Sequence, residues 1–247
     1  MPESTGPLLV EWGDDRVVAT LNRPHVKNAI DQETIDAWHA LCAELEQHPK
    51  ILIVAGSEGV FASGADIREL RDRNAADARR GINANAFIRI NALPLPVIAA
   101  IDGYALGGGA ELAYAADLRI GTPRLRIGNP EPSLGILASA GASWRLKEIV
   151  GEAIALDLLL TGRVLDADEA LAARLVTELH SPEGLLPAAH RLADRIARND
   201  PEAIMATKRV FRASRDEHPA IDLAEQAILF ERPAKYQRMT EFLERKK

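Results

Sequence analysis

Two glutamates and a run of glycines in the middle of the chain are the residues best suited to do chemistry together. Gly107, Gly108 and Gly109 are followed by Glu111, and Glu131 lies twenty residues farther on. Glycine lets a ligand approach the backbone closely because it has no Cβ. The alanine-rich segment after Gly108 indicates a helix, whose first turn offers unpartnered amide hydrogens and partial positive charge. This arrangement suits a negatively charged oxygen with a carboxylate beside it.

A second loop of small residues, 61–66, can supply another backbone amide near Ala65. Amides from Ala65 and Gly108 would make the kind of pair that stabilises an oxyanion, such as the enolate oxygen of a thioester. Two buried carboxylates can divide proton transfers, because repulsion and burial separate their pKa values. Taken singly, each feature also fits a simpler interpretation: a tight turn for the glycines, a helix-dipole contact for Glu111 and a solvated loop position for Glu131.

The elements that must position these residues are short and mixed in the first half of the chain. The β-branched run 97–101 predicts a buried strand directly before the glycines, and Asp31 is a good N-cap for an amphipathic helix reaching about residue 48. Further strands are expected at 8–12, 16–21, 51–55, 118–120 and 125–127. Charge-rich 68–81 is the best candidate for a mobile lid. Helices are expected at 143–150, 152–160, 203–214, 220–230 and 234–245.

Composition narrows the class of protein. The net charge is −6 and no basic block stands out, so we expect no nucleic-acid partner. The single cysteine excludes an internal disulfide framework and fits a reducing compartment. We expect neither a signal peptide nor a membrane span, which makes a cytoplasmic protein the default. The six histidines show no metal-ligand spacing, so no metal site is expected.

Several segments together resemble the enoyl-CoA hydratase/isomerase (crotonase) family. In the family's order they are Leu21-Asn22-Arg23-Pro24 with Asn28-Ala29, then 61–69, 102–113, Asn129-Pro130-Glu131 and the tail 242–246. The resemblance covers essentially the whole chain, and the glycine-rich segment with a later glutamate is its most specific part. It implies an α/β fold, a crotonase-type spiral of repeated strand-strand-helix units in residues 1–190. Residues 191–247 would form a helical C-terminal region for oligomerisation.

The resemblance also implies a site. It assigns the oxyanion hole to the amides of Ala65 and Gly108, and the two catalytic carboxylates of the hydratases to Glu111 and Glu131. The positions implied for CoA binding are Val26, Ala62, Ala65, Asp66, Ile67 and Arg68. Relatives act on acyl-CoA thioesters without a metal or redox cofactor. We therefore expect an acyl-CoA substrate, no cofactor, and a homotrimer or a hexamer built as a dimer of trimers.

The presence of both glutamates favours hydration of a 2-enoyl-CoA to a 3-hydroxyacyl-CoA, a hydro-lyase reaction of fatty-acid β-oxidation. Glu111 would position and deprotonate the water, and Glu131 would deliver the proton to C2. Three alternatives stay open: an isomerase that moves the double bond, another acyl-CoA reaction of the family, and a catalytically idle binding or scaffold protein.

The chain departs from the family pattern after Gly135. Ala138, Ser139, Ala142 and Trp144 stand where many hydratases have proline, two glycines and glutamine. Arg174 stands where a glycine is common. These changes leave both glutamates in place and leave the acyl-chain preference open.

Overall fold

The computed structural model describes residues 6–245, and its larger sheet has five strands in the order β1-β2-β3-β4-β6. β1 and β2 form an antiparallel pair, whereas β2, β3, β4 and β6 run parallel to one another. The aliphatic strands β3 and β4 are largely buried, as expected of strands inside a parallel sheet. The strands are β1 (Leu8–Trp12), β2 (Arg16–Leu21), β3 (Ile51–Gly56), β4 (Val97–Ile101) and β6 (Leu118–Gly121).

A second sheet of three short strands stands next to the glycine-rich segment. It has the order β5 (Tyr104–Leu106), β7 (Arg126–Gly128) and β8 (Val164–Asp166). Isolated bridges join Ala62 to Ala105 of β5 and Ala65 to Ile30, so the loop 61–66 is paired both with β5 and with the segment before α1. The sequence analysis did not anticipate β5 and β8, because three residues are too few to show an alternating pattern.

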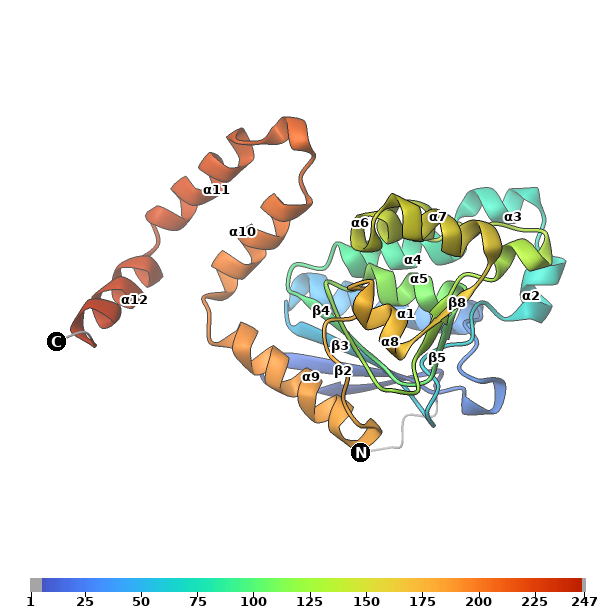
Figure 1. The fold of residues 1–247 in the computed structure, drawn as a ribbon. Helices are drawn as coiled ribbons and strands as arrows, with labels where there is room; N and C mark the ends of the chain where they lie inside the picture. Colours follow the sequence, from blue (N-terminus) through green and yellow to red (C-terminus); the bar gives the residue numbers. More distant parts are fainter. Residues whose placement is uncertain (1–5, 246–247) are drawn as a thin grey trace. The chain divides into compact units, whose positions relative to one another are not determined.

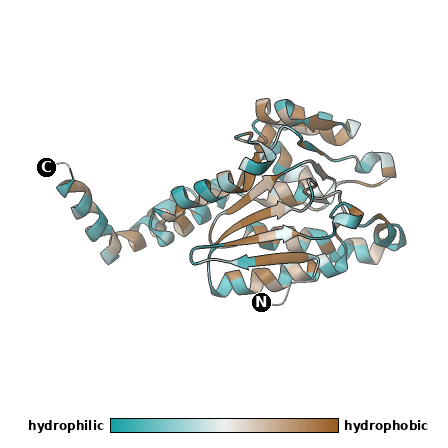
Figure 2. Cartoon of the chain, turned by 90° about the horizontal axis from the view of Figure 1, so that it is seen from below, coloured by the Kyte–Doolittle hydropathy of each residue, from teal (hydrophilic) through white to brown (hydrophobic). Residues whose placement is uncertain are grey.

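Three helices pack beside the larger sheet and share its core (Figure 1). They are α1 (Gln32–Gln47), α4 (Ile82–Asn91) and α5 (Gly108–Ala115). Asp31 caps α1 as predicted, with its side chain accepting from the Thr34 amide. The expected apolar face of α1, from Ile35 to Leu45, is buried in that core. Figure 2 shows the inner strands in the hydrophobic colour and the helices in both colours, as amphipathic packing requires.

The charge-rich segment 68–81 forms two short helices. These are α2 (Ile67–Asp72) and α3 (Ala75–Arg80), and neither contains a buried residue. Asn74 and Asp77 form a capping box at the start of α3. Few buried apolar contacts hold these helices, which is typical of a segment that can move. That they form a mobile lid stays a prediction.

The segment after β7 is more irregular than its sequence pattern predicts. Instead of one α-helix at 143–150, a π-helical turn η3 (Ala142–Leu146) leads into α6 (Lys147–Val150). The turn η2 (Glu131–Leu134) comes before η3, and the helices α7 (Glu152–Thr161) and α8 (Ala167–Ala172) come after α6. Arg174 has φ +58°, a left-handed backbone conformation that glycine adopts without strain.

The chain divides into two compact units, one ending at Ala193 and one starting at Asp194. The division falls in α9 (Pro182–Ala197), a helix that the sequence analysis did not define because Pro182 and Pro187 break its pattern. The second unit contains α10 (Pro201–Arg212), η4 (Arg215–Glu217), α11 (Ala220–Phe230) and α12 (Pro233–Glu244). Within residues 6–245, no helix is long and apolar enough to cross a membrane.

Candidate active site

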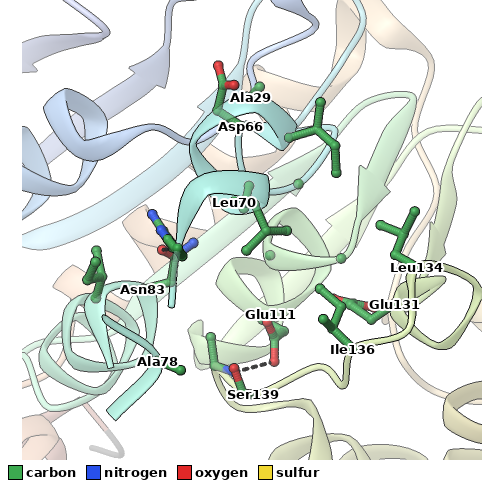
Figure 3. A pocket seen from close by; sticks show the side chains of 18 of the residues that line it. Ala29, Asp66, Leu70, Ala78, Asn83, Glu111, Glu131, Leu134, Ile136 and Ser139 are labelled. Atoms are coloured by element: carbon green, nitrogen blue, oxygen red, sulfur yellow. Dashed lines mark hydrogen bonds between the residues drawn. The ribbon is translucent and has the colours of Figure 1, made fainter. Parts of the chain in front are cut away.

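A cavity of about 1040 Å³ in the first unit brings the predicted chemistry together. Ala65, Gly108, Glu111 and Glu131 all line it. Its walls come from the loop 61–66, the helices α2, α3 and α4, the start of α5 and the segment 130–140. Figure 3 shows Glu111 and Glu131 projecting into this one cavity from different elements.

Two backbone amides face the cavity without acceptors. Gly107 precedes α5 with φ +51°, and Gly108 opens the helix. A Cβ built on Gly108 would stand 3.4 Å from the amide nitrogen of Ala65, so the two loops meet at this point. Neither the Ala65 nor the Gly108 amide donates a hydrogen bond to any other described residue. The pair is therefore available to an oxygen of a ligand.

Glu111 is buried and held by the backbone of a neighbouring loop. Its side chain is only 3% exposed. Its Oε1 accepts hydrogen bonds from the amides of Ala140, at 2.6 Å, and Ala142, at 3.1 Å. The pKa of Glu111 is raised to about 7, chiefly by burial and also by the charge of Glu131, against the opposing effect of the two amides. Glu111 is thus poised to gain or lose a proton near neutral pH.

The loop that holds Glu111 is stabilised by a buried arginine. Arg145 is 8% exposed, and its Nη1 donates to the Ala140 carbonyl at 3.4 Å. Gly141 has φ +139°, and a Cβ there would lie 2.3 Å from the same Nη1. Only a glycine therefore lets the guanidinium pack this closely on the loop. Its positive charge also favours the ionised form of Glu111.

The residues that depart from the family pattern after Gly135 differ in burial and in whether they line the cavity. Ala138 and Ala142 are buried, whereas Ser139 is exposed and lines the cavity beside Glu111 (Figure 3). Trp144 stacks on Arg145, 5.2 Å from guanidinium carbon to ring centroid, and is not among the residues that line the cavity.

Glu131 occupies a different environment. It begins η2 and is 8% exposed. Its Oε1 lies 3.5 Å from Asn129 Nδ2, and Asn129 is oriented by the Tyr114 hydroxyl, which donates to Oδ1 at 3.1 Å. Its Oε2 is buried without a hydrogen-bond partner among residues 6–245. Burial raises the pKa of Glu131 above its ordinary value, and Oε2 is left for a ligand or a proton.

The positions predicted for CoA contact are mostly at the cavity wall. Those that line it are Val26, Ala65, Asp66, Ile67 and Arg68. Ala62 does not: it is fully buried against α5, where a Cβ on Gly109 would lie 2.7 Å from its own Cβ. Asp66 also caps α2 through the Arg68 amide and pairs with Arg23 at 3.5 Å. Among the described residues, no cluster of three or more potential metal ligands occurs.

Some cavity residues were not indicated by the sequence analysis. Leu134, Ile136 and Leu137 line the cavity although they are 56%, 42% and 69% exposed, which makes this wall apolar. Asn83 lines it from α4. A lone asparagine in the first turn of a partly exposed helix shows no pattern that distinguishes it from an ordinary surface position, so no signal marked Asn83 in advance.

The chain is similar to known proteins both in sequence and in fold. The family model described as enoyl-CoA hydratase/isomerase matches residues 16–247. A short-chain-enoyl-CoA hydratase of Clostridium acetobutylicum is 38% identical over 77% of this chain and 75% of its own. A crotonyl-CoA hydratase of Syntrophomonas wolfei is 33% identical over 97% and 96%. An enoyl-CoA hydratase structure from Bacillus anthracis superposes with a TM-score of 0.91 at 26% identity, covering 97% and 96%. The chain belongs to the enoyl-CoA hydratase/isomerase family and has its crotonase fold.

Proposed function

We propose that the protein is an enoyl-CoA hydratase, which adds water reversibly to a 2-enoyl-CoA thioester to give a 3-hydroxyacyl-CoA. One observation carries this proposal: two buried glutamates with raised pKa values share a cavity with two unpaired backbone amides. Relatives whose printed names are enoyl-CoA or crotonyl-CoA hydratase support it.

In the proposed reaction the amides of Ala65 and Gly108 bind the thioester oxygen. They stabilise the negative charge that develops there when C3 is attacked. Because the Ala140 and Ala142 amides both donate to Oε1 of Glu111, its other oxygen is left to take a proton from water as the C3–O bond forms. The C2=C3 electron pair moves into the enolate, and Glu131 transfers a proton to C2. Glu111 ends protonated and Glu131 ionised, so a proton exchange restores the starting state.

An isomerase is the second function that the family allows. Moving a double bond needs one base that carries a proton between two carbons, whereas hydration needs a water that is also held and activated. Glu111 is fixed by two amides and Glu131 has an unpartnered oxygen. This division into a fixed and an unpartnered carboxyl favours hydration.

The remaining parts of the proposal concern partners and setting. We infer that an acyl-CoA substrate binds along the cavity wall from Val26 to Arg68. We also infer that the reaction needs no resident cofactor. The setting we infer is fatty-acid β-oxidation in the cytoplasm. We also infer a homotrimer or a hexamer built through residues 191–247, because α11 and α12 contain no buried residue in the single chain. Light scattering that gave a monomer mass at micromolar concentration would refute the oligomer.

The activity is tested most cheaply by incubating the purified protein with crotonyl-CoA and following the loss of absorbance of the conjugated thioester. Product analysis should show 3-hydroxybutyryl-CoA. A folded protein that binds crotonyl-CoA without converting it would instead support a binding or scaffold role.

A further inference from the structure

A side-chain amide lies close to Gly108 on a third element of the cavity wall. Asn83 lies in the first turn of α4 and lines the cavity together with Ala65 and Gly108. A Cβ built on Gly108 would stand 3.5 Å from Asn83 Nδ2 and 3.4 Å from the amide nitrogen of Ala65. The Asn83 amide group and the Ala65 amide therefore lie at similar distances from one position next to Gly108.

The orientation of Asn83 is set by an arginine. Arg73 Nη1 donates to Asn83 Oδ1 at 3.3 Å, and Arg73 is paired with Glu69, Nη2 to Oε2, at 3.7 Å. A guanidinium can only donate hydrogen bonds, so the atom that it contacts must be the amide oxygen, and the NH₂ group must face elsewhere. Within residues 6–245, Nδ2 has no hydrogen-bond acceptor. An unused donor thus lies next to Gly108, on the cavity wall.

We propose that Asn83 is a third donor of the oxyanion hole and that Arg73 is the residue that positions it. Asn83 Nδ2 donates to the same thioester oxygen that the amides of Ala65 and Gly108 bind. This inference rests on the proposed acyl-CoA chemistry. The hydrogen bond strengthens as negative charge grows on the oxygen, so it acts on the transition state more than on substrate binding. Arg73 polarises the amide that it holds, which makes Nδ2 a better donor.

The supporting elements make this donor conditional on local structure. Arg73 is the C-cap of α2. Asn83 lies two residues after Gly81, which is both the C-cap of α3 and the N-cap of α4. Gly81 has φ +62°, which glycine adopts without strain. The third donor is complete only when α2 and α4 stand as they do here, so the charge-rich helices influence the chemistry through Arg73.

Kinetics with crotonyl-CoA give the first test. We expect Asn83→Ala to lower kcat by about tenfold to a hundredfold, the range for a hydrogen bond to an ionised acceptor, with KM changed far less. Asn83→Asp should lower kcat more, because it places a carboxylate beside the developing charge. Asn85→Ala is the matched control: Asn85 lies on the same helix, donates to the Arg80 carbonyl at 2.7 Å, and does not line the cavity. It should retain the parent kcat.

A spectroscopic readout separates a donor from a merely structural residue. The absorption of 4-dimethylaminocinnamoyl-CoA moves to longer wavelength as its thioester carbonyl is polarised. We expect a smaller shift on binding to Asn83→Ala and Arg73→Met than to the parent, with partial recovery in Arg73→Lys. If folded Asn83→Ala keeps both the parent kcat and the full shift, the third donor is refuted. If the parent does not hydrate crotonyl-CoA but Asn83→Ala still reduces the shift, the hydratase proposal fails while the donor role stands.

Discussion

Two stretches of the chain each present one buried glutamate to the same cavity, and they hold it in different ways. Glu111, on α5, is fixed through Oε1 by the amides of Ala140 and Ala142. Glu131, at the start of η2, has a distant contact to Asn129 and an oxygen with no partner among the described residues. Burial raises the pKa of both carboxyls. The comparison shows how identical side chains can acquire separate roles: a fixed acceptor suits a held water, and an unpartnered oxygen suits proton delivery.

The largest effects should come from neutralising either carboxylate. We expect Glu111→Gln and Glu131→Gln each to lower hydration of crotonyl-CoA by roughly two or more orders of magnitude, the usual scale for a positioned acid or base. Substrate should still bind, since neither change alters the wall from Val26 to Arg68 that we propose binds CoA. Any residual isomerase activity should survive better in Glu111→Gln. Glu44→Gln, an exposed change on α1, is the control. Full hydratase activity in Glu111→Gln would remove the two-glutamate mechanism and favour the isomerase.

A smaller effect should follow from a methyl group added at Gly107, which adjoins both Glu131 and the Gly108 amide. A Cβ on Gly107 would lie 3.0 Å from Glu131 Oε1, and the residue has φ +51°. We expect Gly107→Ala to displace the carboxylate and lower kcat by about tenfold or more, the cost of a misplaced catalytic group. Gly151→Ala is matched for backbone strain, with φ +82° and nothing within 4 Å of its new Cβ. Steady-state kinetics that show equal losses in the two variants would assign the effect to strain.

The corresponding change on the Glu111 side should cost less activity. A Cβ on Gly141 would lie 2.3 Å from Arg145 Nη1, the flexible end of a side chain that can move away. We expect Gly141→Ala to shift the loop that holds Glu111 and to lower kcat several-fold, less than Gly107→Ala does. The comparison needs both variants measured with the same substrate. A larger loss in Gly141→Ala than in Gly107→Ala would show that the anchored glutamate is the more sensitive of the two.

The smallest effect concerns stability and its dependence on pH. The folded protein raises the pKa of Glu111 from 4.5 to about 7, so between these values it binds the proton more tightly than the unfolded chain. Stability therefore falls as pH rises through this window. Gln cannot ionise and keeps an oxygen for the two amides. We expect Glu111→Gln to raise the free energy of unfolding at pH 8 by up to about 3 kcal/mol, and by nothing at pH 4. Urea denaturation at both pH values measures this, and equal stability at pH 8 would contradict it.

The sequence singled out four residues that prove to line one cavity, but not the residues that support them. The glycines and both glutamates could be placed because their residue types carry chemistry, and the family resemblance supplied their register. The amides of Ala140 and Ala142 could not be predicted as partners of Glu111, since a backbone donor has no side chain that marks it. Arg73 lies in a charged stretch and Asn83 at the start of a partly exposed helix, and polar residues are ordinary at both places. The expected single helix at 143–150 becomes a π-helical turn in which Arg145 packs on the loop, a tertiary constraint that periodicity does not contain.

The division of roles between the two glutamates is tested most directly by proton exchange without water addition. Butyryl-CoA has no double bond to hydrate, so incubation in D₂O followed by NMR reports only proton transfer at C2. We predict that Glu111→Gln exchanges the C2 protons at a rate within about tenfold of the parent, whereas Glu131→Gln loses exchange by about a hundredfold or more. Loss of exchange in Glu111→Gln with retention in Glu131→Gln would contradict this assignment.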